Sequence, residues 1–421
     1  MHDPMHDPMA LDDDELPPAF RKRRGGVAGG RVWLWVTAAA ALFGAILAGV
    51  STADFISHLD RQVHSIHCSF IPGAGAQIGD SGCRTVMMSP YSSLFRDSMW
   101  GGLPISVLAL AVFAYLVYRA VDLALAEDVD KRHTVFLLAA TALPVLMSII
   151  YGYISMSVIG TVCKVCAGIY VCSGVLLVGA FLAHRNAGQP TQWAHGGMGG
   201  TYARWFGEGV AYVGLLTVLY IGLAPVSEKS LEGCGTLVTT EDKSNVMIEM
   251  GTRGGDKAIA VLDPLCPACK GFDNRMEASG LMKKLDLDVV LFPLDSKCNW
   301  MVKESLHPGA CLVSQAMLCD KDAAPKILAW AFEHQQELLE AAKKDENNVK
   351  RRLREQFPSV ASCVGTAKAK NKVNKSLRWA VKNALPVLTP QLFVNGKRVC
   401  DEDTDLGLEF TVTKMLEGGR R

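Results

Sequence analysis

The first half of the chain alternates between long apolar runs and short charged connections. Five runs contain no Asp, Glu, Lys or Arg over a length sufficient to cross a bilayer, which takes ~20 residues of helix. The third and fourth runs meet at Gly160-Thr161 and predict a tight helical hairpin. The pattern indicates a bundle of four membrane-spanning helices within residues 32–184, followed by residues 185–227 as a loop and a fifth, linking helix. The five runs cover residues 32–53, 98–118, 133–163, 165–184 and 209–227.

After residue 227 the pattern changes to short strands between amphipathic helices, which predicts an α/β domain over residues 228–421. Asn395-Gly396 separates two of the strands and is typical of a hairpin turn. The predicted strands are residues 257–263, 286–292, 388–394 and 397–399. Helices are predicted up to residue 284, from about 299 to 385, and from about 405 to 417.

Charge is distributed unevenly between these halves. The chain of 421 residues has a formal net charge of +1 and is 49% hydrophobic. Residues 32–227 hold 18 charged side chains among 196 positions, and residues 228–421 hold 56 among 194. The first half is too poor in charge for an ordinary soluble domain, whereas the second half is not. The lack of a basic excess argues against a nucleic-acid partner.

Basic residues in the connections predict the orientation in the bilayer. Residues 1–31, 119–132 and 185–208 together carry ten Lys or Arg, whereas the loop 51–100 carries three. Because basic connections stay on the cytoplasmic side, the N-terminus is predicted inside and residues 228–421 outside. The N-terminal tail, with its MHDP repeat and acidic run, is predicted to be disordered. The first apolar run, 22 residues long, exceeds a signal-peptide core of ~7–15 residues, which favours a retained helix.

The thirteen cysteines agree with that orientation. Cys68 and Cys83 fall in the outside loop, Cys163 and Cys166 at the outer end of the fourth run, Cys172 within a span, and eight in the C-terminal domain. No cysteine falls in a predicted cytoplasmic segment. Since disulfides persist in oxidising compartments, the charge and cysteine distributions indicate the same topology.

Cys266-Pro-Ala-Cys269 lies between a predicted strand and a predicted helix. At a helix N-terminus the backbone N–H groups and the helix dipole stabilise a thiolate, so Cys266 is expected to be the activated thiol. Cys269, one turn later, is placed to resolve a mixed disulfide. A zinc site usually needs a second ligand pair, and the C-terminal domain has no other Cys-x-x-Cys. A zinc site and a purely structural disulfide remain the alternative interpretations of this motif. The favoured interpretation is a redox-active cysteine pair, for which no metal is expected.

Cys266–Cys269 followed by Thr389-Pro390 resembles the thioredoxin fold, and more closely the DsbA-type oxidoreductases with a helical insertion. The resemblance covers about residues 246–417. It implies that Pro390 follows a cis peptide bond and that Thr389-Pro390 packs beside the active-site disulfide. It also implies that Cys266 is the exposed nucleophile and Cys269 the resolving partner.

The membrane half holds a second Cys-x-x-Cys motif, Cys163-Lys-Val-Cys166. The spacing of three predicts both sulfurs on one helix face. Together with Cys68 and Cys83 in the preceding loop, this arrangement resembles the vitamin K epoxide reductase family, specifically its bacterial members fused to a thioredoxin-like domain. The resemblance covers about residues 30–420, including the number of spans and the order of the parts.

The resemblance implies a role for each membrane-half cysteine. Cys166 faces a membrane quinone, either ubiquinone or menaquinone, and Cys163 exchanges with Cys83. Cys68 receives electrons from the thioredoxin-like domain. The glycine-rich stretch of fourteen residues between Cys68 and Cys83 is longer than is usual in the family, but added loop length costs little closure entropy. Two further residues are implied to hold or line the quinone site: Ser89 and Tyr170.

The predicted function is a thiol:quinone oxidoreductase of the bacterial inner membrane that forms disulfide bonds in exported client proteins. Electrons would pass from client thiols to quinone through the three cysteine pairs. Two alternatives stay open. The first is reduction of a naphthoquinone or quinone epoxide with electrons from the thioredoxin-like domain, and the second is a non-enzymatic, membrane-anchored binding domain stapled by disulfides. The relay pairs, in order, are Cys266/Cys269, Cys68/Cys83 and Cys163/Cys166.

The remaining cysteines lack the helix-start position that activates a thiol. Cys172 is predicted to be a small core residue. Six others in the C-terminal domain are predicted to form structural disulfides, with 15 pairings open. These six are Cys234, Cys298, Cys311, Cys319, Cys363 and Cys400.

Overall fold

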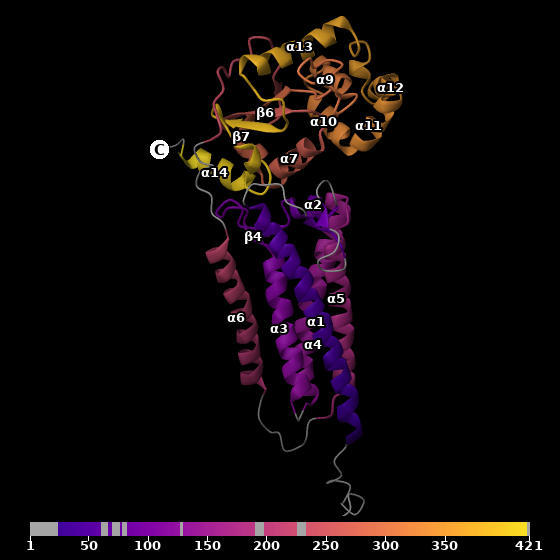
Figure 1. The fold of residues 1–421 in the computed structure, drawn as a ribbon, viewed down its shortest axis with the longest axis vertical. Coiled ribbons are helices and arrows are strands. Elements are labelled where there is room, and N and C mark those ends of the chain that lie inside the picture. Colours follow the sequence, from indigo (N-terminus) through magenta and orange to yellow (C-terminus); the bar gives the residue numbers. More distant parts are fainter. Residues whose placement is uncertain are drawn as a thin grey trace, which may run out of the picture.

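The computed structural model has two parts, a bundle of long helices and an α/β part stacked on one end of it (Figure 1). We call the end of the bundle that faces the α/β part the upper end, as drawn in Figure 1. Residues 1–23 of the tail predicted to be disordered lie outside the described residues, as does most of the stretch between Cys68 and Cys83. Residues 24–31, assigned to the same tail, form the first turns of α1 (Arg24–His58), so that part of the prediction is wrong. The structure describes residues 24–59, 66–69, 76–77, 82–126, 129–189, 198–224 and 233–418.

Five of the described helices are long and apolar enough to cross a membrane, which confirms the predicted number of spans. The third continues as a π-helix, η1, and ends at Gly160, whose φ of 72° lies in the left-handed region. Pro144 lies inside that helix. The helices are α1 (Arg24–His58), α3 (Ile105–Leu125), α4 (Lys131–Tyr153) with η1 (Ile154–Ile159), α5 (Lys164–Asn186) and α6 (Gly199–Leu223).

Two of the predicted spans begin at the wrong residue. The second was placed at residues 98–118, but Gly101 and Gly102 have positive φ and form a turn, so α3 begins only at Ile105. The fifth was placed at residues 209–227, but α6 begins at Gly199. Its first turns include Glu208, whose charge is balanced by Arg119 of α3, with 2.6 Å between Glu208 Oε2 and Arg119 Nη2.

Small residues allow the bundle helices to approach closely, as is common between membrane helices. A Cβ atom at Gly44 of α1 would lie 2.5 Å from the ring of Phe113 on α3. A Cβ atom at Gly179 of α5 would lie 2.6 Å from Thr37 Oγ1 on α1. These contacts place α1 directly against α3 and α5. Helix α6 packs mainly along α3 and is the least buried of the five.

Short elements cover the upper end of the bundle. Strands β1 and β2 pair antiparallel, and β3 pairs antiparallel with β4. Helix α2 lies between the two pairs in sequence and faces the α/β part (Figure 1). The bounds are β1 (Ile66–His67), β2 (Ala76–Gln77), α2 (Gly82–Met87), β3 (Ser93–Leu94) and β4 (Leu103–Pro104).

The α/β part has a five-stranded sheet with the order β5-β7-β6-β8-β9. The central strands β6 and β7 are parallel, and the other pairs are antiparallel. Helix α7 follows β6 directly, and the peptide bond between Thr389 and Pro390, just before β8, is cis. This arrangement is a thioredoxin fold. Its elements are β5 (Ile248–Glu249), β6 (Asp256–Leu262), α7 (Pro267–Ala278), α8 (Leu281–Lys284), β7 (Leu285–Leu291), β8 (Gln391–Val394), β9 (Lys397–Arg398) and α14 (Leu408–Gly418).

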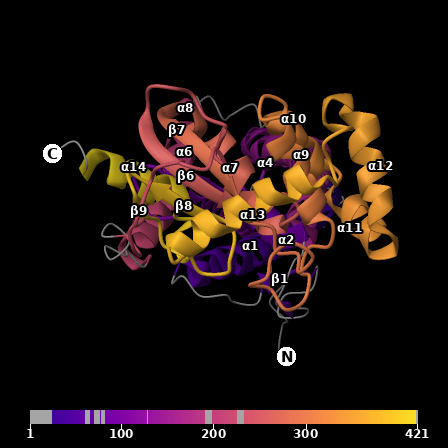
Figure 2. The same cartoon turned by 90° about the horizontal axis from the view of Figure 1, so that it is seen from above.

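The helical stretch predicted from about 299 to 385 consists of several short helices, and the first of them begins at Ala310 rather than near residue 299. Polar caps and a proline interrupt it: Asp345 accepts a hydrogen bond from Asn347 N–H and starts a new helix, and Pro358 follows the end of that helix. Seen from above, α9 to α12 lie on one side of the α/β part and α13 runs across its middle (Figure 2). They are α9 (Ala310–Cys319), α10 (Ala324–Glu333), α11 (Gln335–Lys344), α12 (Glu346–Gln356), η3 (Pro358–Val360) and α13 (Ala367–Lys382).

The six remaining cysteines of the α/β part are paired, which resolves the pairings that the sequence left open. Cys172 is buried in the core of the bundle, as predicted. The disulfides join Cys234 to Cys400, Cys298 to Cys311 and Cys319 to Cys363.

The two parts meet through residues 404–410, which we call the docking segment and which include the start of α14. Leu406 is buried in the apolar core of the bundle's upper end, and Phe410 packs edge-on against Trp100, with 5.9 Å between ring centroids. A Cβ atom at Gly407 would lie 2.3 Å from the Trp100 ring. Trp100 is itself fixed by a hydrogen bond from Nε1 to the Leu59 carbonyl. The contact is therefore a close fit in which one glycine faces one indole ring.

Candidate active site

Cys266 is the N-cap of α7, and Pro267 occupies the first position of the helix. The hydrogen bond from the Cys269 thiol lowers the pKa of Cys266 to about 6, with a further contribution from the Cys269 backbone N–H. Burial raises the pKa of Cys269, which is fully buried, well above that of an ordinary thiol. The Cys266 thiol also lies 3.7 Å from the carbonyl oxygen of Thr389, beside the cis bond to Pro390. The pair thus combines an activated thiol with a protected one.

A buried carboxylate lies directly beneath this pair. Asp263 at the end of β6 accepts hydrogen bonds from the Leu265 and Leu294 backbone N–H groups, each 2.7 Å long. His307 Nδ1 lies 2.8 Å from Asp263 Oδ2. Burial lowers the pKa of His307, but the hydrogen bond to Asp263 and its negative charge outweigh burial and raise it. Sequence patterns did not single out this Asp-His pair, although Asp263 lies only three residues before Cys266.

Cys68 and Cys83 form a disulfide at the upper end of the bundle. Cys68 follows β1, and Cys83 is the second residue of α2. Gly82 brings α2 against the turn between η1 and α5, since a Cβ atom there would lie 2.4 Å from the Val162 carbonyl oxygen. Val162 directly precedes Cys163 in the chain, so this close backbone approach brings Cys83 into the neighbourhood of Cys163.

Cys163 is the N-cap of α5 and Cys166 lies in its first turn. The prediction that both lie on one face of a helix is wrong for Cys163, because its backbone is extended, with φ −84° and ψ 120°. The sulfur of Cys163 instead accepts a hydrogen bond from the Cys166 backbone N–H at 3.2 Å. The motif has the same capping position as Cys266 in α7, so both Cys-x-x-Cys pairs begin a helix.

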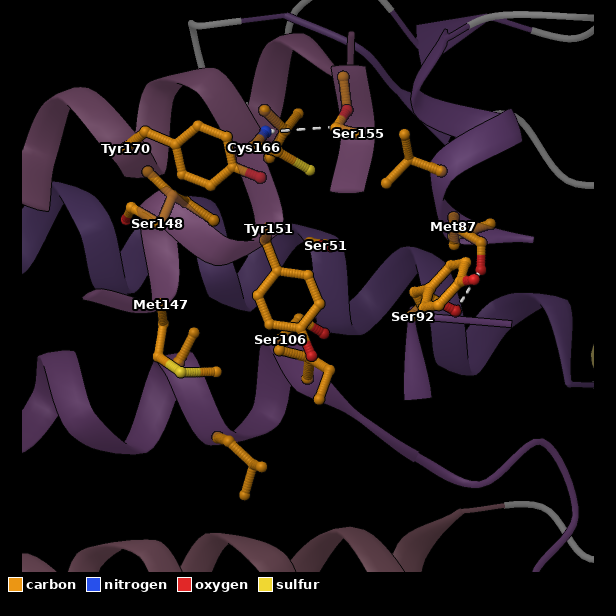
Figure 3. A pocket seen from close by; sticks show the side chains of 18 of the residues that line it. Ser51, Met87, Ser92, Ser106, Met147, Ser148, Tyr151, Ser155, Cys166 and Tyr170 are labelled. Atoms are coloured by element: carbon orange, nitrogen blue, oxygen red, sulfur yellow. Dashed lines mark hydrogen bonds between the residues drawn. The ribbon is translucent and has the colours of Figure 1, made fainter. Parts of the chain in front are cut away.

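A cavity of about 510 Å³ lies inside the upper half of the bundle, and Cys83, Cys163 and Cys166 all line it. Most of its wall is apolar and comes from α1, α3, α4 and α5. Figure 3 shows Cys166 and Tyr170 on one wall and Tyr151 and Met147 on another, with serine hydroxyls between them. A flat, mostly apolar ring with a few hydrogen-bonding oxygens fits this mixture of surfaces, and a quinone head group has that chemistry.

Tyr170 and Ser89, singled out by resemblance, both line this cavity. Tyr170 packs against Gly152 of α4, where a Cβ atom would lie 3.7 Å from the ring. Ser89 donates a hydrogen bond to the Val86 carbonyl at 2.7 Å, and its own carbonyl accepts one from Arg96. Ser89 therefore fixes the turn after α2 as well as facing the cavity.

A second polar pair at the cavity was not anticipated from the sequence. Asp54 of α1 accepts a hydrogen bond from the His67 backbone N–H at 2.9 Å, and its other oxygen lies 2.7 Å from His67 Nδ1. Both residues line the cavity. The position of His67 next to Cys68, and a carboxylate within the upper turns of a membrane-spanning helix, were signals that could have revealed the pair.

The structure gathers the predicted residues into two groups. Cys266 and Cys269 lie with Thr389 and Pro390 in the α/β part, and the other predicted residues gather at the upper end of the bundle. The face of the α/β part that carries α7 is turned toward α2 (Figure 1). In the described part of the chain, no group of three or more His, Cys, Asp or Glu is arranged to hold a metal ion. The second group is Cys68, Cys83, Ser89, Cys163, Cys166 and Tyr170.

These features define a class of protein: a thiol–disulfide oxidoreductase built from apolar, membrane-capable helices and a thioredoxin fold. Residues 35–181 match the model of the vitamin K epoxide reductase family, and the chain therefore carries a domain of that family. No curated protein matches the chain.

Solved structures with a similar shape are DsbA proteins. Reduced DsbA1 from Neisseria meningitidis is 14% identical, with 47% of this chain and 97% of that chain covered and a TM-score of 0.32. A second structure of the N. meningitidis protein, NmDsbA1, is 12% identical, with coverage of 47% and 96% and a TM-score of 0.32. DsbA from Xylella fastidiosa is 16% identical, with coverage of 41% and 95% and a TM-score of 0.27.

Proposed function

We propose that this protein oxidises the thiols of exported client proteins and passes the electrons to a membrane quinone. One observation carries the proposal: the cysteine pair at the start of α5 and Cys83 of the upper disulfide line a single apolar cavity inside a membrane-capable bundle. A thioredoxin-fold domain with an activated Cys266 is stacked on the same end of that bundle. The proposal assigns the thioredoxin-fold domain to the client thiols, the disulfide between Cys68 and Cys83 to the intermediate step and the cavity to the electron acceptor.

The proposed relay is a series of thiolate exchanges. The disulfide of Cys266 and Cys269 takes two electrons from a client dithiol, and the Cys266 thiolate then attacks Cys68 and releases Cys83. Cys269 attacks Cys266 and frees Cys68 as a thiolate. The low pKa of Cys266 suits it as the attacking group, and the buried Cys269 acts only within the mixed disulfide.

The second half of the relay takes place at the cavity. Cys83 attacks Cys163 and releases Cys166, and Cys68 then closes the disulfide with Cys83 again. Cys163 and Cys166 are left reduced, with Cys166 facing the cavity. A quinone bound there supplies the two-electron acceptor. The direction of each exchange depends on the difference in reduction potential between the two cysteine pairs. A difference of ~30 mV corresponds to about 1.4 kcal/mol.

The proposed topology places the N-terminus in the cytoplasm and the upper end of the bundle outside it, in a bacterial inner membrane. It rests on the ten basic residues in segments 1–31, 119–132 and 185–208 against three in the loop 51–100. The proposed units are a tail (1–31), a four-helix domain (32–184), a loop and linking helix (185–227) and a thioredoxin-like domain (228–421). All six relay cysteines then lie on the oxidising side or at its membrane boundary.

Quinone-dependent thiol oxidation by the whole chain in membranes tests the proposal. Membranes that carry the protein are expected to oxidise a reduced peptide when ubiquinone or menaquinone is present, and not when quinones have been extracted. Oxidation that is independent of quinone contradicts the proposal. Because the family is described by vitamin K epoxide reduction, a naphthoquinone epoxide is tested in parallel. Turnover of the epoxide without quinone-dependent peptide oxidation favours that alternative function.

The order of the relay is tested by a trapped intermediate. The Cys166→Ala chain leaves Cys163 without its partner, so the mixed disulfide of Cys83 with Cys163 is expected to accumulate on non-reducing gels. Cys172→Ala removes a buried cysteine that does not line the cavity and serves as the matched control. The expected order is wrong if Cys163 is instead found joined to Cys68 or to Cys266.

A further inference from the structure

The proposed reaction requires protons as well as electrons at the cavity. Reduction of a quinone to a quinol takes two electrons and two protons. When Cys166 reacts as a thiolate, it has already lost its own proton, so the Cys163 thiol supplies one proton and a second group must supply the other. The question is which side chain of the cavity wall can do so.

Asp54 and His67 are the candidates. Among the described residues that line the cavity, no other Asp, Glu, Lys, Arg or His is found. The Asp54 side chain is 8% exposed, whereas the His67 side chain is 35% exposed. His67 therefore touches both the cavity and the solvent at the upper end, and a proton can be replaced from that side after each turnover.

Hydrogen bonds fix the orientation of the His67 ring. With Asp54 Oδ1 2.7 Å from Nδ1, that nitrogen carries a hydrogen and donates it to the carboxylate. The His67 backbone N–H is held by the other carboxylate oxygen. His58 Nδ1 donates to the Asp54 backbone carbonyl at 2.9 Å and steadies the same turn of α1. The remaining ring nitrogen, Nε2, is the one left to carry a proton toward a partner.

We propose that His67, held in place by Asp54, is the proton donor to the quinone in this cavity. The inference rests on the proposed function. The balance is complete: the Cys163 thiol and the Cys166 thiolate form a disulfide and lose two electrons, one proton leaves Cys163 and one leaves the His67 imidazolium. The quinone oxygens receive both protons and the product is a neutral quinol. Neutral His67 then regains its proton from water at the upper end.

Other groups near β1 share this environment. The titratable or charged groups on the elements packed against β1 are Asp54 and His58 of α1 and Cys83 and Arg84 of α2, and those on the other cavity walls are Tyr91, Tyr151, Cys163, Cys166 and Tyr170. Histidine is the residue type among them whose charge ordinarily changes near neutral pH. Loss of proton donation at high pH is therefore assigned to His67, and loss of thiolate at low pH is assigned to the cysteines.

Single-turnover reduction of a short-tailed ubiquinone by the pre-reduced full chain tests the inference. The wild-type rate is expected to rise with pH as the thiolate forms and to fall again as His67 loses its proton. The His67→Gln chain is expected to be about 100-fold slower, a typical loss for a general acid, and to lack the falling limb. Asp54→Asn, which keeps a hydrogen-bonding side chain but removes the charge, is expected to show an intermediate loss.

His334→Gln is the matched control, because His334 is half-buried in the α/β part and bonded to the Trp330 carbonyl. Its rate and pH profile are expected to equal those of the wild type. Added imidazole is expected to restore activity to the His67→Ala chain in part, since the site opens to solvent. Recovery of activity with imidazole also shows that the bundle of the variant is folded.

A binding measurement gives a readout that does not depend on turnover. The anion of 2-hydroxynaphthoquinone carries the negative oxygen that an imidazolium stabilises. The wild-type chain is expected to bind it about tenfold more tightly than His67→Gln at low pH, with the difference lost at high pH. Equal binding together with a wild-type rate and pH profile in His67→Gln overturns the inference. If the wild-type chain binds the analogue in this His67-dependent way but does not reduce quinone, the proposed function fails instead.

Discussion

At the scale of single residues, the two Cys-x-x-Cys motifs show how position converts one residue type into two chemical roles. In each motif the first cysteine is the N-cap of a helix, while the second lies within the first turn. The pKa of Cys266 is lowered to about 6, whereas that of Cys269 is raised by burial. In α7 the motif therefore provides an attacking thiolate and a reserve thiol without any change of residue.

The lowered pKa of Cys266 predicts a pH profile for alkylation of the reduced full chain. With a pKa of about 6, roughly a tenth of Cys266 is thiolate at pH 5 and roughly nine-tenths at pH 7. The rate of alkylation by iodoacetamide is therefore expected to rise about tenfold between these values and then to level off. Tandem mass spectrometry of the tryptic peptide that contains both cysteines measures the rate at Cys266, with Cys269 as internal control. A midpoint near that of a free thiol, ~8.5, contradicts the prediction.

Sequence alone could identify the cysteines but not their polar neighbours. Cys266 and Cys269 stand out because strand, motif and helix follow one another in the chain. Asp263 and His307 are 44 positions apart and meet only because the segment after β7 returns to the end of β6. Asp54 of α1 and His67 of β1 are 13 positions apart in the chain and meet in space. Contacts of this kind depend on the tertiary path of the chain, which a local pattern does not contain.

At the scale of elements, the hydrophobic pattern found all five long helices but not all of their ends. Absence of charge was the criterion, and α3 and α6 include charged residues that the structure neutralises. Arg119 is almost fully buried, paired with Glu208 and placed over the Trp205 ring at 4.6 Å. A charge that is paired and covered in this way can extend a helix beyond its apolar run. The number of helices could thus be predicted, whereas their bounds depended on partners distant in sequence.

The contact between α2 and the turn before α5 predicts a specific effect of one methyl group. Gly82→Ala would place a Cβ atom 2.4 Å from the Val162 carbonyl oxygen, so α2 must shift away from the turn. In a Cys166→Ala background, the yield of the mixed disulfide between Cys83 and Cys163 is expected to fall severalfold on non-reducing gels.

Gly174→Ala is the matched control for that substitution. Gly174 is also a glycine of the bundle, but a Cβ atom there meets no atom within 4 Å. The control is expected to give the same yield of mixed disulfide as the Cys166→Ala chain alone. Equal yields in Gly82→Ala and Gly174→Ala show that Cys83 reaches Cys163 without the close approach of the two backbones.

At the scale of the whole molecule, the two parts are joined by complementary surfaces as well as by the chain. Leu406 enters the core of the bundle's upper end, and Gly407 lies against Trp100. Arg275 of α7 donates to the Thr404 carbonyl at 2.7 Å, which links the helix of the active-site pair to the docking segment. The docking segment therefore contacts both the bundle and the element that presents Cys266.

Filling the space at Gly407 is expected to separate the proposed electron donor from its acceptor. Gly407→Val collides with the Trp100 ring, so transfer from Cys266 to Cys68 is expected to slow at least tenfold. Thiol trapping in cells would then show Cys266 and Cys269 reduced while Cys68 and Cys83 stay oxidised.

Two further variants serve as controls for the effect of Gly407→Val. Gly418→Val, at a position where a Cβ atom meets nothing within 4 Å, is expected to behave as the wild type. The double variant Gly407→Ala with Trp100→Phe has a smaller side chain at each position, which removes the collision with the indole ring. This variant is expected to recover transfer from Cys266 to Cys68. Wild-type redox states in Gly407→Val contradict a role for this contact.

The disulfide between Cys234 and Cys400 has a consequence for competition between partners. It attaches the start of the C-terminal domain to the edge of its sheet, eleven positions after the last residue of α6, Leu223. Eleven residues span at most ~40 Å, so an undocked domain stays within that radius of its bundle. Tethering of this kind corresponds to an effective local concentration in the millimolar range. A diffusible thioredoxin-like protein at ~1 μM would thus meet the disulfide between Cys68 and Cys83 about a thousandfold less often than the tethered domain does. The covalent connection alone therefore favours reaction of the bundle with its own domain.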